Sequence, residues 1–368
     1  MRVLYVINGF DPGGAEHGLL TLIETGFFES CELHVFAICR GASSLAEKVR
    51  QAVGPNRFQL TANTEALTFA DMIRAVPELF RVMKDARPEL VVLSLKQANL
   101  LGRGVLALFP GTECVSFEHI ARHTPLKTEL LYAPLLLLSS WRVDRVWADC
   151  RETLTATRRY FLPRRRAKTV VPLFCVRSDL PAKQSYRIDK SIRIACAGRL
   201  IERKNFLLVI EMLAKMRAER HDFNLDIYGE GPQRTELVER AAALGLAAYI
   251  SFHGYTPAWF EQALEADIFV NMSSMEGFCI VVAEAMSVGL PVIATNVGGI
   301  AEYGSDDVNM LKLEQPDEAG LANRIARLAV DEALRRRIGQ RARADMFAQF
   351  SAEALRQRGR DVLSHSAG

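Results

Sequence analysis

Residues 192–228 read IRIACAGRLIERKNFLLVIEMLAKMRAERHDFNLDIY, and this stretch decides the fold. It opens with an apolar run at 192–197, followed by a polar turn. A helical segment over 205–220 comes next, and a second apolar run at 223–228 ends the stretch. The order strand, helix, strand predicts a parallel βαβ unit.

The same alternation extends in both directions along the chain. The first half predicts strands at 2–7, 33–38, 90–95, 114–117 and 145–148, with helices at 15–26, 45–53, 70–86 and 127–138. The second half continues with helices at 232–244, 257–265 and 279–288 and strands at 249–252, 267–271 and 291–294, before a helix-rich tail at 317–363. The strands are nearly continuous apolar runs, which is typical of parallel sheets covered by helices on both faces.

The length of 368 residues favours two domains. We predict an α/β protein with two Rossmann-like, doubly wound domains that face a cleft. Residues 1–172 form the first domain, 173–190 a linker and 191–345 the second domain, and 346–368 form a helix that returns to the first domain. Ligands of such sheets bind beyond the carboxyl ends of the strands, so the loops there are the place to look for chemistry.

Composition narrows the class of protein. The chain is 49% hydrophobic and 24% charged, which excludes a disordered protein, and its net charge of +3 gives no reason to expect nucleic acid as a partner. Seven scattered cysteines without a CxxC pair indicate reduced thiols in the cytoplasm and no zinc site. No apolar run reaches the ~20 residues that span a bilayer. Six basic residues crowd one segment, either as a solvated face or as a patch for anionic lipid headgroups: Arg158, Arg159, Arg164, Arg165, Arg166 and Lys168.

Two strand-end loops carry residues that suit phosphate. The first strand leads into Pro12-Gly13-Gly14-Ala15-Glu16, where glycine amides at a helix start bind an anion or simply form a tight turn. The strand at 192–197 leads into a loop with Arg199 and Lys204. Together these cations can hold a pyrophosphate, although a solvated surface pair is the structural alternative.

The most specific element is EGFCIVVAEAM at residues 276–286. It places Glu276 in a strand-end loop and Glu284 inside the following helix. The amides of Gly277, Phe278, Cys279 and Ile280 at the helix start can bind phosphate or sugar oxygens. A helical rise of ~9 Å from Phe278 to Glu284 would span a diphosphate and its ribose.

These motifs resemble those of the GT4-type retaining glycosyltransferases, which have the GT-B fold. The spacing of Glu276 and Glu284 matches the EX7E element of that family, and Gly198-Arg199-Leu200 with Lys204-Asn205 looks like its GRL…KN segment. Further segments in the family's order are Gly229-Glu230-Gly231-Pro232, Phe252-His253-Gly254-Tyr255, Gly289–Ala294, Val297-Gly298-Gly299 and Pro12–Glu16. The chain departs from the pattern at Val171–Val176, where relatives often have a Pro-Asn-Gly-Val turn, and at Ala301, which replaces a frequent proline.

The resemblance implies that 1–172 is the acceptor-side domain and 191–345 the nucleotide-sugar-binding domain, and it implies a role for each matching position. Gly13 and Gly14 would approach the diphosphate, Arg199 and Lys204 would hold it, and Glu276 with the amides after it would hold the donor sugar. Glu284 would bind the ribose, and the segments around Gly229, His253 and Gly254 would border the base. His119 looks like the family's histidine that points into the catalytic cleft, with His123 as a nearby competitor.

We therefore expect a cytoplasmic enzyme that moves a sugar from a nucleotide diphosphate donor, with UDP favoured and GDP as the alternative, to a glycan or lipid-linked acceptor. The chain has no Asp-x-Asp pair, so we expect no metal and no separate cofactor. Surface polysaccharide or glycolipid synthesis at the inner face of the membrane is the expected setting, with peripheral membrane contact as an option. The rival interpretations are a GT-B-shaped epimerase or phosphorylase and a non-catalytic carbohydrate- or lipid-binding relative. The sequence leaves the sugar, the acceptor and the oligomeric state open.

Overall fold

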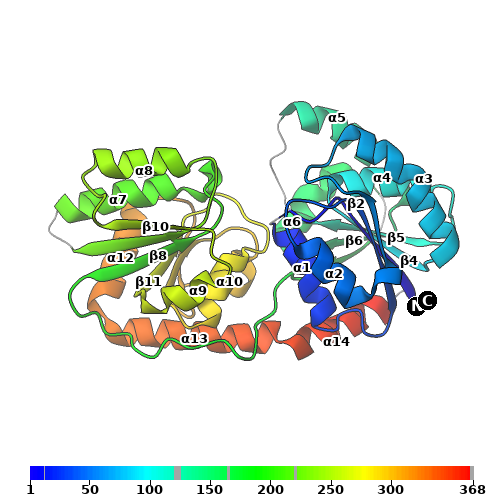
Figure 1. Ribbon diagram of the computed structural model, residues 1–368. Helices are drawn as coiled ribbons and strands as arrows, with labels where there is room; N and C mark the ends of the chain where they lie inside the picture. Colours follow the sequence, from blue (N-terminus) through cyan, green and yellow to red (C-terminus); the bar gives the residue numbers. More distant parts are fainter. Residues whose placement is uncertain (12, 120–125, 164–165, 219–221, 365–368) are drawn as a thin grey trace. The chain divides into compact units, whose positions relative to one another are not determined.

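The computed structural model describes residues 1–11, 13–119, 126–163, 166–218 and 222–364. The chain forms two compact units (Figure 1). The first consists of Met1–Cys175 together with Ala352–Gly368, and the second of Val176–Ser351. Each unit is built on its own parallel sheet.

The first unit has a seven-stranded sheet with the order β3-β2-β1-β4-β5-β6-β7, in which every pairing is parallel. Its strands are β1 (Arg2–Ile7), β2 (Glu32–Cys39), β3 (Phe58–Ala62), β4 (Leu90–Ser94), β5 (Glu113–Glu118), β6 (Arg145–Ala148) and β7 (Ala167–Val170). Its helices are α1 (Gly14–Glu24), α2 (Leu45–Val53), α3 (Phe69–Ala86), α4 (Lys96–Leu106), α5 (Leu126–Ser139), α6 (Arg151–Ala156) and α14 (Ala352–Ser364).

The centre of this sheet is apolar because helices cover both faces. All five residues of β4 are buried, as are the last five of β1. Helices α3, α4 and α5 pack side by side, and α1 packs against α2. Pro134 lies inside α5 and does not end it.

Helix α14 belongs to the first unit, although it lies at the far end of the sequence. Gly359 of α14 approaches the backbone of Phe27 so closely that an added Cβ would lie 2.1 Å from the Phe27 carbonyl oxygen. The buried Arg145 donates to the carbonyl oxygen of Val362 over 2.9 Å, and Arg360 pairs with Glu29 at 2.7 Å. The expected start of this segment at residue 346 falls inside α13, which belongs to the second unit, so the crossing segment begins only after Ser351.

The second unit has a six-stranded parallel sheet with the order β10-β9-β8-β11-β12-β13. Its strands are β8 (Ile192–Ala197), β9 (Phe223–Tyr228), β10 (Ile250–Gly254), β11 (Ile268–Asn271), β12 (Val292–Thr295) and β13 (Leu311–Leu313). Its helices are α7 (Phe206–Ala218), α8 (Arg234–Ala243), α9 (Trp259–Gln262), α10 (Ile280–Ser287), α11 (Ile300–Tyr303), α12 (Glu318–Val330) and α13 (Glu332–Phe350). Helix α7 packs between α8 and α12, while α10 packs along α13 (Figure 1).

The predicted linker at 173–190 is part of the folded units. Leu173 packs against Gly18 in the first unit, and the amide of Val176 donates to the carbonyl oxygen of Phe350 in the second. Tyr186 is buried and its hydroxyl donates to the carbonyl oxygen of Gly289, while the Lys183 ammonium donates to the carbonyl oxygens of Leu264 and Ala266, in and just after the turn that follows α9. The segment looks like a linker in sequence because it is polar and irregular, but its apolar residues are anchored.

The sequence prediction missed three strands and three helices. Strands β3, β7 and β13 are short, mostly half-exposed, and lie at the sheet edges, so they lack the continuous apolar runs of the central strands. The missed helices are α4, α6 and α11, of which α6 and α11 are only six and four residues long. Within the described ranges, no helix combines the length and the apolarity needed to cross a bilayer.

Candidate functional site

The strand order of the second unit has a reversal between β8 and β11, which pair directly at the centre of the sheet. Chain connections run outward in opposite directions from these two strands, so the loops at their carboxyl ends leave a crevice. The loop after β8 contains Arg199 and Lys204, and the loop after β11 contains Glu276 and Gly277. Two motifs separated by more than seventy residues therefore meet at the position where doubly wound sheets bind ligands.

Lys204 and Glu276 form a buried ion pair at this reversal. The Lys204 ammonium lies 2.5 Å from Oε1 of Glu276, and the two side chains are only 11% and 8% exposed. Desolvation alone would lower the pKa of Lys204 and raise that of Glu276, but the neighbouring opposite charge outweighs it for both groups. The pKa of Lys204 is therefore raised and that of Glu276 lowered, so both groups are charged at neutral pH.

The start of α10 offers amide donors beside this pair. Among the residues that the structure describes, the backbone N–H groups of Gly277, Cys279 and Ile280 have no hydrogen-bond partner. Cys279 has a left-handed backbone with φ of 64°, a strained conformation for a residue with a side chain. Free amides at a helix start together with a buried ammonium group form a site for an anion.

The geometry of this segment differs from the expected one in two respects. The left-handed Cys279 keeps the helix from starting before Ile280, so the helical rise to Glu284 is ~6 Å and not ~9 Å. The Phe278 ring is buried against Tyr303 and Phe350, with ring centroids 5.2 Å from each. Only the backbone of Phe278 is therefore available to a ligand.

Glu284 lies at the end of a row of aromatic rings. Its carboxylate accepts a hydrogen bond of 2.8 Å from the indole nitrogen of Trp259. The Trp259 ring lies 5.9 Å from Tyr228, which stacks on His253 at 4.5 Å. Burial raises the pKa of Glu284 to about 7, and the Trp259 hydrogen bond partly opposes that rise. The sequence analysis did not select Trp259 as a site residue. The available signal was that a buried tryptophan needs an acceptor for its indole N–H, and Trp259 lies in a predicted helix.

Glycines hold the strand ends of this site together. The amide of Gly198 donates to the carbonyl oxygen of Tyr228, and the amide of Gly229 donates to that of Gly254. An added Cβ on Gly229 would lie 1.9 Å from the Gly198 carbonyl oxygen, and the φ of 147° at Gly229 disfavours any side chain. The three loops after β8, β9 and β10 are thus fixed to one another, and His253 is oriented further by Asp226 at 2.7 Å.

Arg199 is the most open of the predicted ligands. It is exposed, and within the described part of the chain its guanidinium has no hydrogen bond or ion pair. Its position after β8 places it in the same loop as Lys204. A guanidinium without protein partners keeps all of its donors for a ligand.

The first unit has a corresponding reversal between β1 and β4. Gly13 precedes α1 with an extended backbone, and Gly14 is the first residue of α1; Pro12 lies outside the described residues. An added Cβ on Gly13 would lie 2.4 Å from the carboxylate of Glu16, so this carboxylate folds back over the helix start. Glu16 is 8% exposed, and burial raises its pKa to about 7, with Asp11 adding to the rise. Sequence reasoning quoted Glu16 but did not foresee this position.

His119 lies at the end of β5, on the same edge of the first sheet. Its Nε2 is 2.7 Å from the hydroxyl of Ser94, and its ring lies 4.3 Å from that of Phe117. Nδ1 is buried and has no partner among the described atoms. Desolvation lowers the pKa of His119 to about 3, so the imidazole is neutral at physiological pH. The competitor His123 lies outside the described residues.

Other predicted features lie away from these two sites. Arg166, from the basic segment, donates to the carbonyl oxygens of Ser140, Val143 and Leu162, while Arg164 and Arg165 lie outside the described residues. The chain as described holds no cluster of three or more His, Cys, Asp or Glu residues suited to a metal ion.

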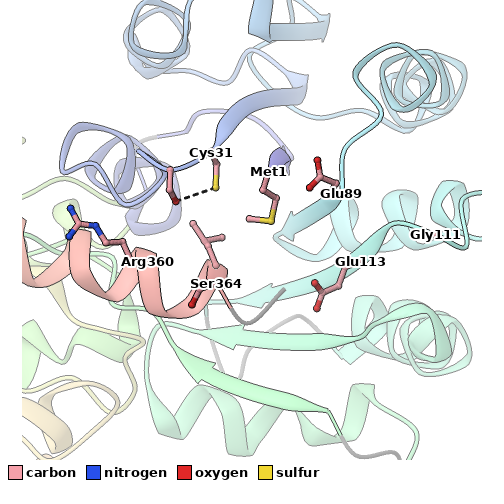
Figure 2. A pocket seen from close by; sticks show the side chains of 9 residues that line it. Met1, Cys31, Glu89, Gly111, Glu113, Arg360 and Ser364 are labelled. Carbon is pink, nitrogen blue, oxygen red and sulfur yellow. Dashed lines mark hydrogen bonds between the residues drawn. The ribbon is translucent and has the colours of Figure 1, made fainter. Parts of the chain in front are cut away.

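A cavity of about 610 Å³ opens in the first unit at the opposite, amino-terminal edge of its sheet (Figure 2). Met1, Cys31, Glu89 and Glu113 line it just before or at the starts of strands, and α14 contributes Arg360. Glu113 pairs with Arg145, and Arg360 pairs with Glu29. The cavity is therefore separate from the strand-end sites.

Two parallel sheets of seven and six strands, each with a strand-order reversal, define a GT-B protein. Solved structures agree with this fold. HepE from Anabaena, solved in complex with UDP-glucose, aligns with a TM-score of 0.79 at 19% identity over 99% of this chain and 100% of that one. The apo lipopolysaccharide outer core galactosyltransferase WaaB aligns with a TM-score of 0.72 at 16% identity, again over 99% of this chain.

Residues 180–345 match the family model of glycosyl transferases group 1. The lipopolysaccharide core biosynthesis glycosyltransferase LpsE of Rhizobium meliloti is 31% identical over 158 residues, which is 43% of this chain and 45% of LpsE. N-acetyl-alpha-D-glucosaminyl L-malate synthase of Bacillus anthracis is 31% identical over 47% of this chain and 45% of that enzyme. The chain thus spans a little under half the length of the curated relatives that it matches.

Proposed function

We propose that this protein is a retaining glycosyltransferase that moves a hexose-type sugar from a nucleotide diphosphate sugar to a glycan or lipid-linked acceptor. The observation that carries the proposal is the buried Lys204–Glu276 pair beside the free amides at the start of α10. The Lys204 ammonium suits a diphosphate, and the Glu276 carboxylate suits the hydroxyls of a sugar. A simple anion site would need no buried carboxylate.

A second subsite lies along α10. Glu284 would accept hydrogen bonds from the ribose diol, while Tyr228, His253 and Gly254 would border the base. The row of rings that leads to Glu284 supports this assignment, because it provides an apolar surface beside a single polar anchor. We favour UDP over GDP because HepE, which has the same fold, was solved with UDP-glucose.

In the proposed reaction an acceptor hydroxyl attacks the anomeric carbon on the face from which the nucleotide departs. The bond between that carbon and the phosphate oxygen breaks, the bond to the acceptor oxygen forms, and the departing phosphate oxygen takes the hydroxyl proton. Arg199, Lys204 and the α10 amides meet the charge that develops on the diphosphate, so the reaction needs neither a metal nor another cofactor. Glu276 holds the sugar, and the neutral imidazole of His119 is the candidate catalytic group that the first unit supplies.

The proposed setting is the cytoplasmic side of a membrane, in the synthesis of surface polysaccharide or glycolipid, with peripheral contact to the bilayer. LpsE, named for lipopolysaccharide core biosynthesis, supports this setting. Nucleic acid is not a proposed partner.

Donor binding and transfer test the proposal separately. Thermal unfolding of the full chain with UDP, GDP and their sugar conjugates, with and without EDTA, should show stabilisation by one nucleotide family that survives EDTA. A donor labelled in its sugar should then pass label to an acceptor extract. A released sugar-nucleotide isomer without any acceptor would indicate an epimerase, and binding without any turnover would indicate a non-catalytic relative; either result would overturn the proposal.

A further inference from the structure

Helix α3 of the first unit exposes a stripe of large apolar side chains. Phe69 is 78% exposed, Ile73 58%, Val76 46% and Phe80 37%. At about 100° of rotation per residue, these four side chains fall within an arc of about 60° on the helix surface. Single exposed apolar residues are ordinary, but a stripe that runs along most of an 18-residue helix indicates a surface that something covers.

The stripe continues beyond the carboxyl end of α3. The Phe80 ring lies 5.3 Å from that of Phe109, and the neighbouring Leu108 is 68% exposed. The apolar surface therefore extends from α3 to the loop after α4.

Basic side chains flank the stripe. Arg74, Arg81 and Lys84 are exposed and occupy the arc next to it. Arg74 reaches Asp71 only at 4.0 Å, and the Lys84 ammonium lies 5.8 Å from the centre of the Phe80 ring. Of the three acidic side chains on the helix, Asp71 is buried, Glu78 is half-buried and only Asp85 is exposed. The exposed side of α3 is thus apolar along one edge and net positive along the next.

We propose that α3 lies on an anionic lipid bilayer, with Phe69, Ile73, Val76 and Phe80 inserted at the level of the headgroups. Basic residues beside an apolar edge are the composition of helices that bind membrane surfaces in this orientation. Charge complementarity favours an anionic bilayer over a second copy of the chain, because two identical faces in contact would place the positive charges of Arg74, Arg81 and Lys84 near those of the other copy. The inference gives the proposed transfer to a lipid-linked acceptor its location, but vesicle binding requires neither donor nor turnover.

Sedimentation of the full chain with vesicles tests the proposal. Vesicles of phosphatidylcholine alone are compared with vesicles that contain one third phosphatidylglycerol, in the absence of nucleotide. The chain should sediment with the anionic vesicles and remain in solution with the neutral ones. F69S/I73S should lower the affinity about tenfold or more through lost apolar burial. R74E/R81E should lower it at least as much, because each basic residue near an anionic surface contributes about fivefold.

The control is V330S in the second unit, where Val330 is 87% exposed and stands alone. It should sediment like the unchanged chain, and all variants should unfold at the same temperature because the altered side chains are exposed. Three results would overturn the proposal: no sedimentation with anionic vesicles, equal sedimentation of F69S/I73S and V330S, or a dimer in solution that F69S/I73S converts to a monomer. A bound donor with no vesicle binding would leave the transferase proposal standing and remove this one.

Discussion

Replacing Glu284 by glutamine should stabilise the second unit at high pH while it weakens nucleotide binding. Burial raises the pKa of Glu284 from 4.5 to about 7, so the folded chain holds this proton more tightly than the unfolded chain does. Between these two pH values the unfolded carboxyl has lost its proton and the folded one retains it. The free energy of unfolding therefore falls as pH rises through this window and remains lower above it.

The size of the effect follows from the shift in pKa. Each pKa unit corresponds to about 1.4 kcal/mol, and for a half-buried carboxyl we expect a gain of about 2–3 kcal/mol for E284Q at about pH 8. At about pH 5 the gain should be below about 1 kcal/mol, because most of the folded carboxyl groups are then neutral. A glutamine oxygen can still accept the hydrogen bond from Trp259, so the change creates no unpaired indole. For a unit of this size the gain at high pH corresponds to a rise in Tm of roughly 5–10 °C.

The assay is thermal unfolding of the full chain followed by calorimetry at both pH values, which separates the transition of the second unit from that of the first. E261Q is the matched control, because Glu261 is an exposed carboxyl on the neighbouring α9 and should change Tm little at either pH. Nucleotide affinity, measured by titration, should fall for E284Q and not for E261Q. A gain in Tm that is equal at the two pH values, or a loss at pH 8, would refute the assignment of the raised pKa to burial of Glu284.

Three further changes probe the remaining parts of the two sites. K204A should abolish measurable transfer and destabilise the second unit by about 3–5 kcal/mol, because it leaves the buried Glu276 carboxylate without a counter-charge. The control K215A removes only an exposed ion pair and should retain activity. Normal turnover of K204A in a transfer assay would show that Lys204 has no catalytic role. G229A should unfold at markedly lower temperature than G245A, because both positions have positive φ but only an added Cβ at Gly229 collides with backbone; equal melting temperatures would count against that collision. The first unit should lose stability as pH falls from about 6.5 towards 3, because His119 stays neutral when folded and takes up a proton when unfolded. Over the same pH range the free energy of unfolding of H119Q should fall less than that of the unchanged chain.

The parts of the fold that could be predicted are those in which burial is continuous. Strand β8 and helix α7 were found almost to the residue, because an apolar run and a helical period leave few alternatives. The edge strand β7 could not be found, because AKTV has no apolar run and pairs only through its backbone with β6. The segment at 173–190 looks like a linker in sequence because its anchors are isolated side chains such as Tyr186, whose hydroxyl bonds to a residue more than a hundred positions away.

The candidate site likewise has parts that the sequence predicts and parts that it does not. Lys204 and Glu276 could be selected because each follows a strand, and strand ends of a parallel sheet gather at one edge. Their direct contact could not be predicted, since it depends on β8 and β11 being neighbours across the reversal in strand order. The left-handed backbone of Cys279 could not be predicted for a different reason. The sequence there is compatible with an uninterrupted helix start, and only the folded backbone shows the strain.

The charges at the two strand-edge sites differ, and they suit the two units to different ligands. The second unit presents a buried ammonium, an unpaired guanidinium and free amides, a set that attracts a diphosphate. At the equivalent helix start of the first unit, the space beside Gly13 holds the carboxyl of Glu16, which would repel a diphosphate whenever it is ionised. A carboxyl with a pKa near 7 is better matched to a neutral hydroxyl, to which it can donate or from which it can accept a hydrogen bond. This chemistry supports the proposed acceptor-side role of the first unit, and the expected approach of Gly13 and Gly14 to a diphosphate would require Glu16 to be protonated.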